Sequence, residues 1–321
     1  MDVNNEILDA IEIMVGRAMK NSAAIYTCRV VSVNADKTCL VVANGGEYTV
    51  RYYGAQPKKN EPQPLFVPYS NMSKAFIIVA GDGGSTPEPT PTDNPYITFS
   101  SPAAFTVSVN ATGGWDGTVE YSTNAASWST WDGSATSAVQ SGGKYMLYMR
   151  GINNTKLMNG FTTHFVINGS DVSCDGNMET LLDYATVVNG GHPTMASFAF
   201  YGAFYECTAL VSCPSLPAIE LTEDCYGWMF YGCPNLLTVP KLPATTLATE
   251  CYNGMFNGCT SIKLSTVQSG EYTQAYRIPF EGTGTAGSGS LTNMFANTGG
   301  TAVGTPTINT AYYLSNTNKI V

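Results

Sequence analysis

The chain has 321 residues, of which 12% are charged and 44% hydrophobic, and its formal net charge is -9. A typical globular chain is about 25% charged, and here Gly, Thr, Ser and Asn replace the missing charge, which favours β-structure and turns over helices. The acidic balance argues against a nucleic-acid-binding protein, and two histidines argue against a histidine-rich metal site.

Residues 1–22 are predicted to form an amphipathic helix, because apolar side chains recur at helical spacing between 4 and 20. Acidic residues interrupt this apolar pattern, so we expect the protein to be made in the cytoplasm and not exported by a Sec signal. The apolar face needs a cover, either the next module or copies of the same helix, and the second choice predicts a homotrimer. The expected oligomer contact consists of Ile7, Leu8, Ile11, Val15 and Met19.

Residues 23–80 are predicted to form a small closed β-barrel. Five β-type runs, at 25–34, 39–43, 48–53, 64–67 and 74–79, are separated by turn residues. The OB fold is the obvious candidate for so short a barrel. The run QPLFVPYSNMSKAFIIVAG resembles the last part of the OB-type barrels of bacteriophage tail and baseplate proteins, which implies an anchoring module. Nucleic-acid binding by its few basic residues is the less favoured alternative.

Residues 81–95, GDGGSTPEPTPTDNP, are expected to be a semi-extended linker. In residues 96–170, apolar alternation and turn signals every 8–12 residues predict an immunoglobulin-like β-sandwich. Three of the four tryptophans lie in this module. We expect Trp128 to pack in its core, whereas Trp115 and Trp131 either pack there or stack on sugar rings at the surface.

Residues 171–321 contain an internal repeat of 26 residues. The segment FYECTALVSCPSLPAIELTEDCYGWM is followed by FYGCPNLLTVPKLPATTLATECYNGM and then by FNGCTSIKL. Phe295 lies 39 residues, one and a half periods, after Phe256, so an insertion at about 268–290 interrupts the last repeat. Equivalent positions should form interior ladders in a stack of units. The repeat core consists of Phe204, Cys207, Leu210, Phe230, Cys233, Leu236, Phe256, Cys259 and Ile262.

The nine cysteines are odd in number and include no CxxC pair. The ladder explains several of them without redox chemistry, because cysteine is a small apolar residue with a weak hydrogen-bond donor. Disulfides between neighbouring units are the less favoured alternative. A metal site is less favoured still, because no histidine accompanies the ladder, and no cofactor is expected.

These units resemble the leucine-rich repeats of the BspA-like surface proteins, whose signature is Phe-x-x-Cys-x-x-Leu followed by Leu-Pro. The signature matches residues 204–217 and again 230–243. The stretches WDGTVEYSTN and NMETLLDYATVVNGGHPTMASFAFYGAF are similar to the modules that precede such arrays in gut bacterial and phage proteins. The resemblance covers about 96–300 and implies binding through outward side chains. Candidate surface or carbohydrate contacts are Trp115, Trp131, Tyr205, Trp228, Tyr231 and Tyr252.

The alternative for the tyrosines and for Trp228 is that they only cover the ladder. Because no motif such as GxSxG, a P-loop or HExxH is present, we expect no enzyme. No run of about 18 apolar residues is found, so no membrane insertion is expected, and the acidic charge predicts no nucleic-acid partner.

The sequence as a whole predicts a mainly β, multidomain protein: an N-terminal helix, an OB-like barrel, an immunoglobulin-like sandwich and a leucine-rich-repeat solenoid of α/β repeats with a C-terminal cap. The predicted function is that of a structural virion protein of a bacteriophage, a fibre, spike, or tail or head appendage. Its N-terminal region would bind other virion proteins, and its distal modules a host glycan or protein. One alternative is a bacterial cell-surface adhesin, which would need an export signal and an anchor. Another is a capsid or tail decoration protein without receptor binding.

Overall fold

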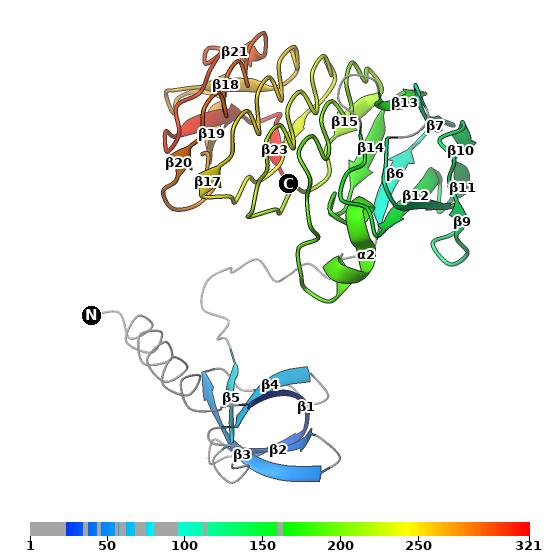
Figure 1. Ribbon diagram of the computed structural model, residues 1–321. Coiled ribbons are helices and arrows are strands. Elements are labelled where there is room, and N and C mark those ends of the chain that lie inside the picture. Colours follow the sequence, from blue (N-terminus) through cyan, green and yellow to red (C-terminus); the bar gives the residue numbers. More distant parts are fainter. Residues whose placement is uncertain are drawn as a thin grey trace. The chain divides into compact units, whose positions relative to one another are not determined.

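The computed structural model describes residues 24–34, 38–43, 46–54, 57, 62–67, 75–79, 96–111, 114–158 and 163–321. The chain divides into two compact units, Met1–Glu88 and Pro89–Val321, each described here by itself (Figure 1). The predicted helix at 1–22 with its oligomer contact, and the predicted linker at 81–95, lie outside the described residues. The mainly β character is confirmed, and the described part of the chain holds one short helix.

In the first unit, five strands close on themselves in the order β1-β2-β3-β5-β4 (Figure 1). Their bounds are β1 Ala24–Val33, β2 Thr38–Ala43, β3 Gly46–Gly54, β4 Pro62–Val67 and β5 Phe76–Val79. Every neighbouring pair is antiparallel except β3 and β5, which are parallel. Along β2, Cys39, Val41 and Ala43 are buried and the residues between them are not, as the two-residue period of a strand requires.

The second unit begins with two sheets that face one another. The larger has the order β15-β14-β6-β12-β8-β9, with β11 also paired to β12, and the smaller has the order β10-β7-β13. Phe99 of β6 meets Phe165 of β13 edge to face, with 5.9 Å between ring centroids. The strands are β6 Ile97–Ser101, β7 Thr106–Val109, β8 Thr118–Ser122, β9 Ser129–Thr130, β10 Thr136–Ser137, β11 Val139–Ser141, β12 Lys144–Ile152, β13 Phe165–Asn168, β14 Val172–Asp175 and β15 Leu210–Ser212.

The larger sheet continues into the repeats, because β14 pairs in parallel with β15. The boundary predicted at 170 therefore falls beside a strand that joins both regions. The short helix α2 (Thr180–Val188) packs on β12, where Gly151 lies so close that a Cβ atom would stand 1.7 Å from the carbonyl oxygen of Leu181. A single hydrophobic core extends from Ile97 to Leu314, so the sheets and the repeats form one body.

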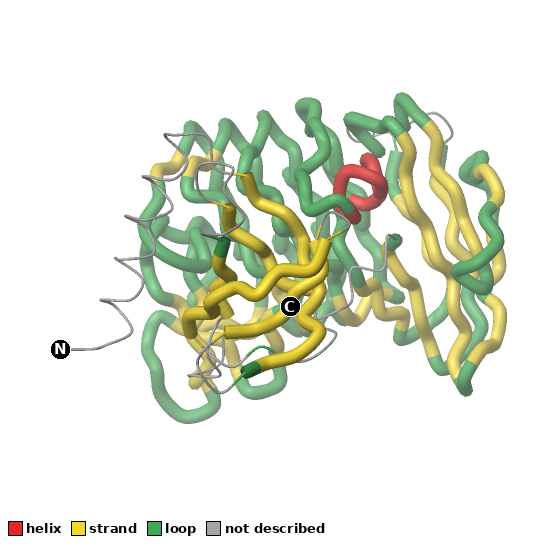
Figure 2. Tube along the Cα trace, turned by 90° about the horizontal axis from the view of Figure 1, so that it is seen from below, coloured by secondary structure: helices red, strands yellow, loops and turns green. Residues whose placement is uncertain are grey.

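The repeats are built from four runs of turns, drawn as loops in Figure 2. We name these runs coil 1 (198–207), coil 2 (224–233), coil 3 (250–259) and coil 4 (289–297). Within each coil, two inward-pointing side chains are followed by two outward-pointing ones, so the pattern repeats every four residues. This period differs from the 3.6-residue period of a helix and from the two-residue period of a strand. Residues with positive φ recur at the same places in the coils: Phe198, Gly202 and Glu206, then Asp224, Trp228 and Gly232, then Glu250, Gly254 and Gly258, then Gly289, Asn293 and Asn297.

Backbone hydrogen bonds join each coil to the next. The amide of Phe204 donates to the carbonyl of Met229 at 2.8 Å, an offset of 229 − 204 = 25 residues. From coil 3 to coil 4 the offset is 294 − 256 = 38, because Phe256 donates to Met294 at 2.9 Å. Amides between these positions donate to a carbonyl three residues back, such as that of Cys207 to Phe204 at 3.1 Å. In both steps the accepting carbonyl belongs to the methionine directly before the equivalent phenylalanine. The offsets of 25 and 38 therefore confirm the 26-residue repeat and the 39-residue step.

The side chains that point inward form ladders, as the sequence predicts. The inner column, which we define as Phe204, Phe230, Phe256 and Phe295, is fully buried, with successive ring centroids 5.5, 5.6 and 6.1 Å apart. It extends into the facing sheets, because Phe165 stacks on Phe204 at 5.3 Å. All nine cysteines are buried.

The cysteine ladder has a specific hydrogen-bonding role. The thiols of Cys233 and Cys259 donate to the carbonyl oxygens of Phe204 and Phe230, each at 3.0 Å. Each bond links one coil to the coil before it, and a residue of this size with a weak donor fits such a place.

The insertion at about 268–290 completes the array. It supplies β19 (Tyr272–Tyr276) and β20 (Thr285–Ala286), of which β20 pairs in parallel with β17 (Thr246–Leu247). The strand β22 (Tyr312–Ser315) lies between β19 and β18, and Tyr312 meets Phe295 edge to face at 5.7 Å and so covers the inner column. The remaining strands are β16 Thr238–Val239, β18 Lys263–Ser265, β21 Gly299–Gly300 and β23 Lys319–Ile320.

Candidate functional site

Three aromatic side chains gather on the outward side of coils 1 and 2. The rings of Tyr205 and Tyr231 lie nearly parallel, 8° apart with 5.1 Å between centroids, and the Trp228 indole stacks on Tyr231 at 4.7 Å. All three side chains are half-buried, so the stack reaches solvent. We call Tyr205, Trp228 and Tyr231 the outer aromatic cluster.

Glycines in the following coil make room for this cluster. A Cβ atom at Gly254 would stand 3.2 Å from Nε1 of Trp228, so the indole lies over Gly254. In the same way a Cβ atom at Gly232 would stand 3.0 Å from Cγ of Glu206. The Trp228 and Glu206 side chains therefore lie against the backbone of the next coil.

Trp228 occupies a strained position in the backbone. Its φ is +56°, and the equivalent positions in coils 1, 3 and 4 are Gly202, Gly254 and Asn293, with φ of +59°, +57° and +54°. Glycine and asparagine tolerate this left-handed region, whereas a bulky side chain there costs roughly 1–2 kcal/mol. The backbone at position 228 therefore has a conformation that favours glycine or asparagine, although the residue there is tryptophan.

The outer aromatic cluster has different neighbours at its two ends. Next to coil 1, the His164 ring lies 5.8 Å from that of Tyr205. At the other end, the third coil carries Asn257 where coils 1 and 2 carry tyrosine. Asn297 donates from Nδ2 to Oδ1 of Asn257 at 3.0 Å, so an amide pair stands where the stack of rings stops.

The outward side of the coils is acidic. None of the four coils contains a Lys or Arg residue, whereas Glu206, Asp224 and Glu250 all point to this side and Glu223 directly precedes coil 2. Burial first, and then the nearby carboxylates of Glu250 and Glu223, raise the pKa of Asp224 to about 6. Burial lowers the pKa of His164, against the opposing charge of Glu206. The surface around the rings therefore disfavours negative ligands.

The structure places three of the six predicted surface contacts in this cluster and the other three elsewhere. Trp131 is only 2% exposed and stacks on Phe165, and Tyr252 is only 1% exposed and stacks on Tyr226. The prediction of surface contacts is wrong for Trp131 and Tyr252, which belong to the core. Trp115 is half-buried and lies against Trp131, with ring centroids 5.4 Å apart.

The predicted core position of Trp128 is also wrong. Trp128 is half-buried, and the guanidinium of Arg150 lies 4.2 Å from its ring centroid. The same guanidinium lies 4.1 Å from the ring centroid of Tyr184, and Glu120 accepts a hydrogen bond from Nε of Arg150 at 2.7 Å. Since the arginine is already satisfied by these contacts, this group stabilises the sheet surface and we assign it no binding role.

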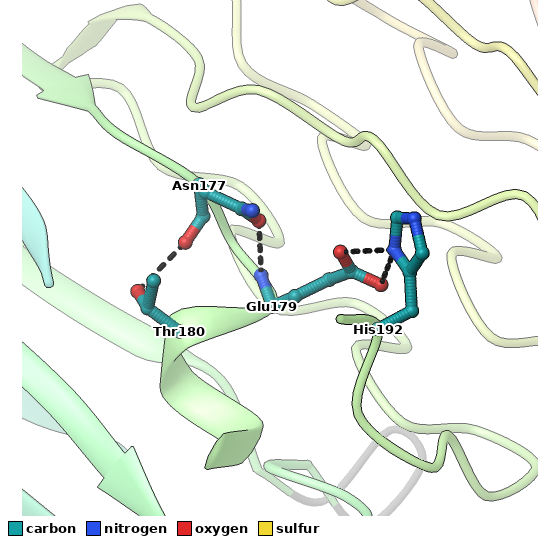
Figure 3. A network of polar contacts seen from close by, with 4 residues as sticks. All are labelled: Asn177, Glu179, Thr180 and His192. Atoms are coloured by element: carbon teal, nitrogen blue, oxygen red, sulfur yellow. Dashed lines mark hydrogen bonds and ion pairs between the residues drawn. The ribbon is translucent and has the colours of Figure 1, made fainter. Parts of the chain in front are cut away.

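A second polar cluster surrounds the beginning of α2 (Figure 3). The carboxylate of Glu179 is 1% exposed, and its partner is Nδ1 of His192, at 2.8 and 3.0 Å from the two oxygens. Asn177 accepts hydrogen bonds from the amide of Glu179 at 2.8 Å and from the hydroxyl of Thr180 at 2.7 Å. Burial raises the pKa of Glu179, and His192 opposes that shift. The cluster ties the segment after α2 to the beginning of the helix.

The cysteine thiols are suited to packing. Burial raises the pKa of Cys207 to about 11 and those of Cys213 and Cys225 to about 12, so these thiols are protonated at neutral pH. In the described ranges, no group of His, Cys, Asp or Glu is arranged to hold a metal ion. No helix among the described residues is long and apolar enough to span a bilayer.

Comparison of the chain with protein-family models, curated proteins and solved structures finds no match. The functional argument therefore depends on the geometry of the outer aromatic cluster. Flat rings that reach solvent, next to amide and carboxylate groups, can stack on an apolar face of a ligand while bonding to its hydroxyl groups.

Proposed function

We propose that the protein is a structural virion protein of a bacteriophage, a fibre, spike, or tail or head appendage that displays an adhesive surface to the host. The observation that carries the proposal is Trp228, a bulky residue held at positive φ in a half-buried aromatic stack. Residues in unfavourable backbone regions cluster at sites of function. Here the strained residue belongs to a surface on coils that backbone hydrogen bonds join to one another, which fits a preformed binding site for a host surface.

The proposed architecture is an OB-like anchor followed by an immunoglobulin-like sandwich and a BspA-like leucine-rich-repeat solenoid. The strand order of the first unit, with its single parallel pair, supports the OB assignment. Two facing sheets, antiparallel except for the pairing of β14 with β15, support the sandwich, and a period of 26 residues falls in the range of leucine-rich repeats.

The proposed partners follow from this division. The N-terminal region, including Ile7, Leu8, Ile11, Val15 and Met19, would bind other virion proteins and associate as a homotrimer. Several copies on one particle would let weak contacts at the outer aromatic cluster add up to firm attachment. We propose no enzymatic activity and no cofactor.

Antibody fragments against each unit test this function. Fab fragments raised against Pro89–Val321 should label purified phage particles from the producing culture and block their adsorption to host cells. Fragments raised against Met1–Glu88 should leave adsorption unchanged, because that unit is proposed to be the anchor. Labelling of the bacterial envelope in place of particles would favour the adhesin alternative, and labelling of particles without any block of adsorption would favour the decoration alternative.

A further inference from the structure

We propose that the outer aromatic cluster binds an uncharged, gluco-configured pyranose chain, with one sugar ring stacked on Tyr231 over Asn257. This inference rests on the proposed host-binding function and adds the chemical class of the ligand. It starts from a break in a regular pattern: coils 1 and 2 carry a tyrosine at the equivalent position, whereas coil 3 carries Asn257.

The geometry of the column indicates where a ring would lie. Successive rings follow the coil spacing, with Tyr231 5.1 Å from Tyr205 on the outside and Phe256 5.6 Å from Phe230 on the inside. The inner column continues through coil 3, whereas the outer one stops at Tyr231. At the position of coil 3 that is equivalent to Tyr231, the chain carries Asn257 in place of another aromatic residue, while Gly254 lies beneath the Trp228 indole.

A gluco-configured pyranose fits this place because its ring hydrogens are axial and form two apolar faces. Such a face stacks on an aromatic ring, and the equatorial hydroxyls then point sideways toward polar groups. In the described part of the chain, Nδ2 of Asn257 and Oδ1 of Asn297 have no partner beyond the bond that joins the two amides. They offer one donor and one acceptor beside the stacked ring. Glu206, which lies over Gly232, offers a carboxylate acceptor on the same side.

The negative charge of this surface determines which class of sugar it can bind. The outward side of the coils has carboxylates at Glu206, Asp224 and Glu250, and none of the four coils contains Lys or Arg. A uronic acid, a sialic acid or a phosphate-bearing glycan would be repelled. The surface therefore fits a neutral glycan and excludes an anionic one.

Titration calorimetry of the full chain tests the assignment, with cellohexaose and chitohexaose as neutral probes and oligogalacturonate of similar length as the anionic probe. At least one neutral probe should bind, and the anionic probe should not. Tyr231→Ala should weaken binding by about 3- to 10-fold, the range expected for one lost stacking contact. Tyr231→Phe keeps the ring and should bind like the unchanged chain, as should Tyr272→Ala, a half-buried tyrosine in β19 outside the cluster.

A second variant tests the position of the sugar. Asn257→Tyr extends the outer column by one ring, and the fold should accept it because coils 1 and 2 already carry tyrosine there. The new ring would take the proposed place of the sugar, so neutral-probe binding should be lost while the thermal unfolding temperature is kept. Unchanged or tighter binding by this variant overturns the assignment.

The other outcomes separate the ligand class from the proposed function. Equal binding of the anionic probe, or no effect of Tyr231→Ala, overturns the ligand class or its place. If neither neutral probe binds but the full chain still adheres to host cells, the ligand class is wrong and the attachment function stands. If the chain binds neither sugar nor cells, both proposals fail.

Discussion

The inner column runs through all four coils, whereas the outer aromatic cluster lies on coils 1 and 2 alone, and the two differ in regularity. The inner column keeps phenylalanine in every coil and is covered at its end by Tyr312. The outer positions change from Tyr205 and Tyr231 to Asn257. A residue that recurs in every coil is needed for the packing of the coils. A residue that occurs in only one or two coils is not required for that packing and is available for another function.

The energetic consequences should differ accordingly. Fully burying a side chain of this kind contributes about 1.5–3 kcal/mol, and each inner phenylalanine is fully buried. The outer rings keep part of their surface in water, so the fold depends on them less. Substitutions in one set of rings or the other therefore test whether the two differ in what they contribute to stability.

The largest effect is expected from Phe230→Ala. The substitution leaves a cavity in the middle of the inner column and should lower the free energy of unfolding by about 3–5 kcal/mol. Phe256→Ala should behave alike because its environment is equivalent, whereas Tyr231→Ala should cost less than about 1.5 kcal/mol. Urea denaturation followed by circular dichroism measures all three. Similar losses for Phe230→Ala and Tyr231→Ala would show that the two columns do not differ.

The next effect concerns pH. Since the pKa of Asp224 is about 6 in the folded chain and 3.8 is its ordinary value, the folded state binds the proton more tightly than the unfolded state. Stability should therefore fall as the pH rises from about 4 to 7, by up to roughly 2 kcal/mol from this group. Asp224→Asn removes the titration and tolerates the positive φ of 51°. Denaturation midpoints of the two proteins should converge at pH 4 and separate in favour of the variant at pH 7.

A smaller effect is expected where the glycines support the outer rings. Gly254→Ala places a Cβ atom 3.2 Å from Nε1 of Trp228 at a residue whose φ is +57°. The variant should lose about 1 kcal/mol and show a shifted Trp fluorescence spectrum. Gly270→Ala is the matched control, because its φ is +62° and no atom lies within 4 Å of the added methyl group. A spectral shift in the control as well would mean that the change does not arise at Trp228.

The smallest change in stability should accompany Trp228→Gly. The lost stacking contact, about 0.5–1.5 kcal/mol, is offset by removal of the left-handed strain, about 1–2 kcal/mol. The melting temperature should stay nearly constant while binding to the neutral probe falls. A large loss of stability with no loss of binding would assign Trp228 to packing alone.

The sequence was sufficient to predict the inner column. Identical residues 26 positions apart can stack only if each repeat makes one turn of the array, and the 39-residue step to Phe295 follows from the same spacing. The strand segments of both units were also predictable, because alternation with a period of two is a local property. In contrast, the parallel pairing of β14 with β15 depends on contacts between distant segments, which a local pattern does not contain.

The prediction of the site was only partly successful, because the coils follow a period of four. Without that period, Tyr252 and Trp228 are equally good neighbours of the core, although Tyr226 and Tyr252 point inward and Trp228 points outward. Glycine was the missed signal. A large residue followed 26 positions later by glycine, as in Trp228 and Gly254, marks a side chain that lies on the next coil.

The pairing of β16 with β23 affects how the chain is made on the ribosome. These strands are parallel neighbours, although Thr238 pairs with Lys319, about 80 residues further along. Asn318 also bonds to the carbonyls of Leu237 and Ser261, at 3.0 and 3.1 Å. At a synthesis rate of 5–20 residues per second, the edge of β16 waits roughly 4–16 s for its partner. Until then the second repeat presents an open strand edge to the solvent, and the emergence of residues 318–320 closes it.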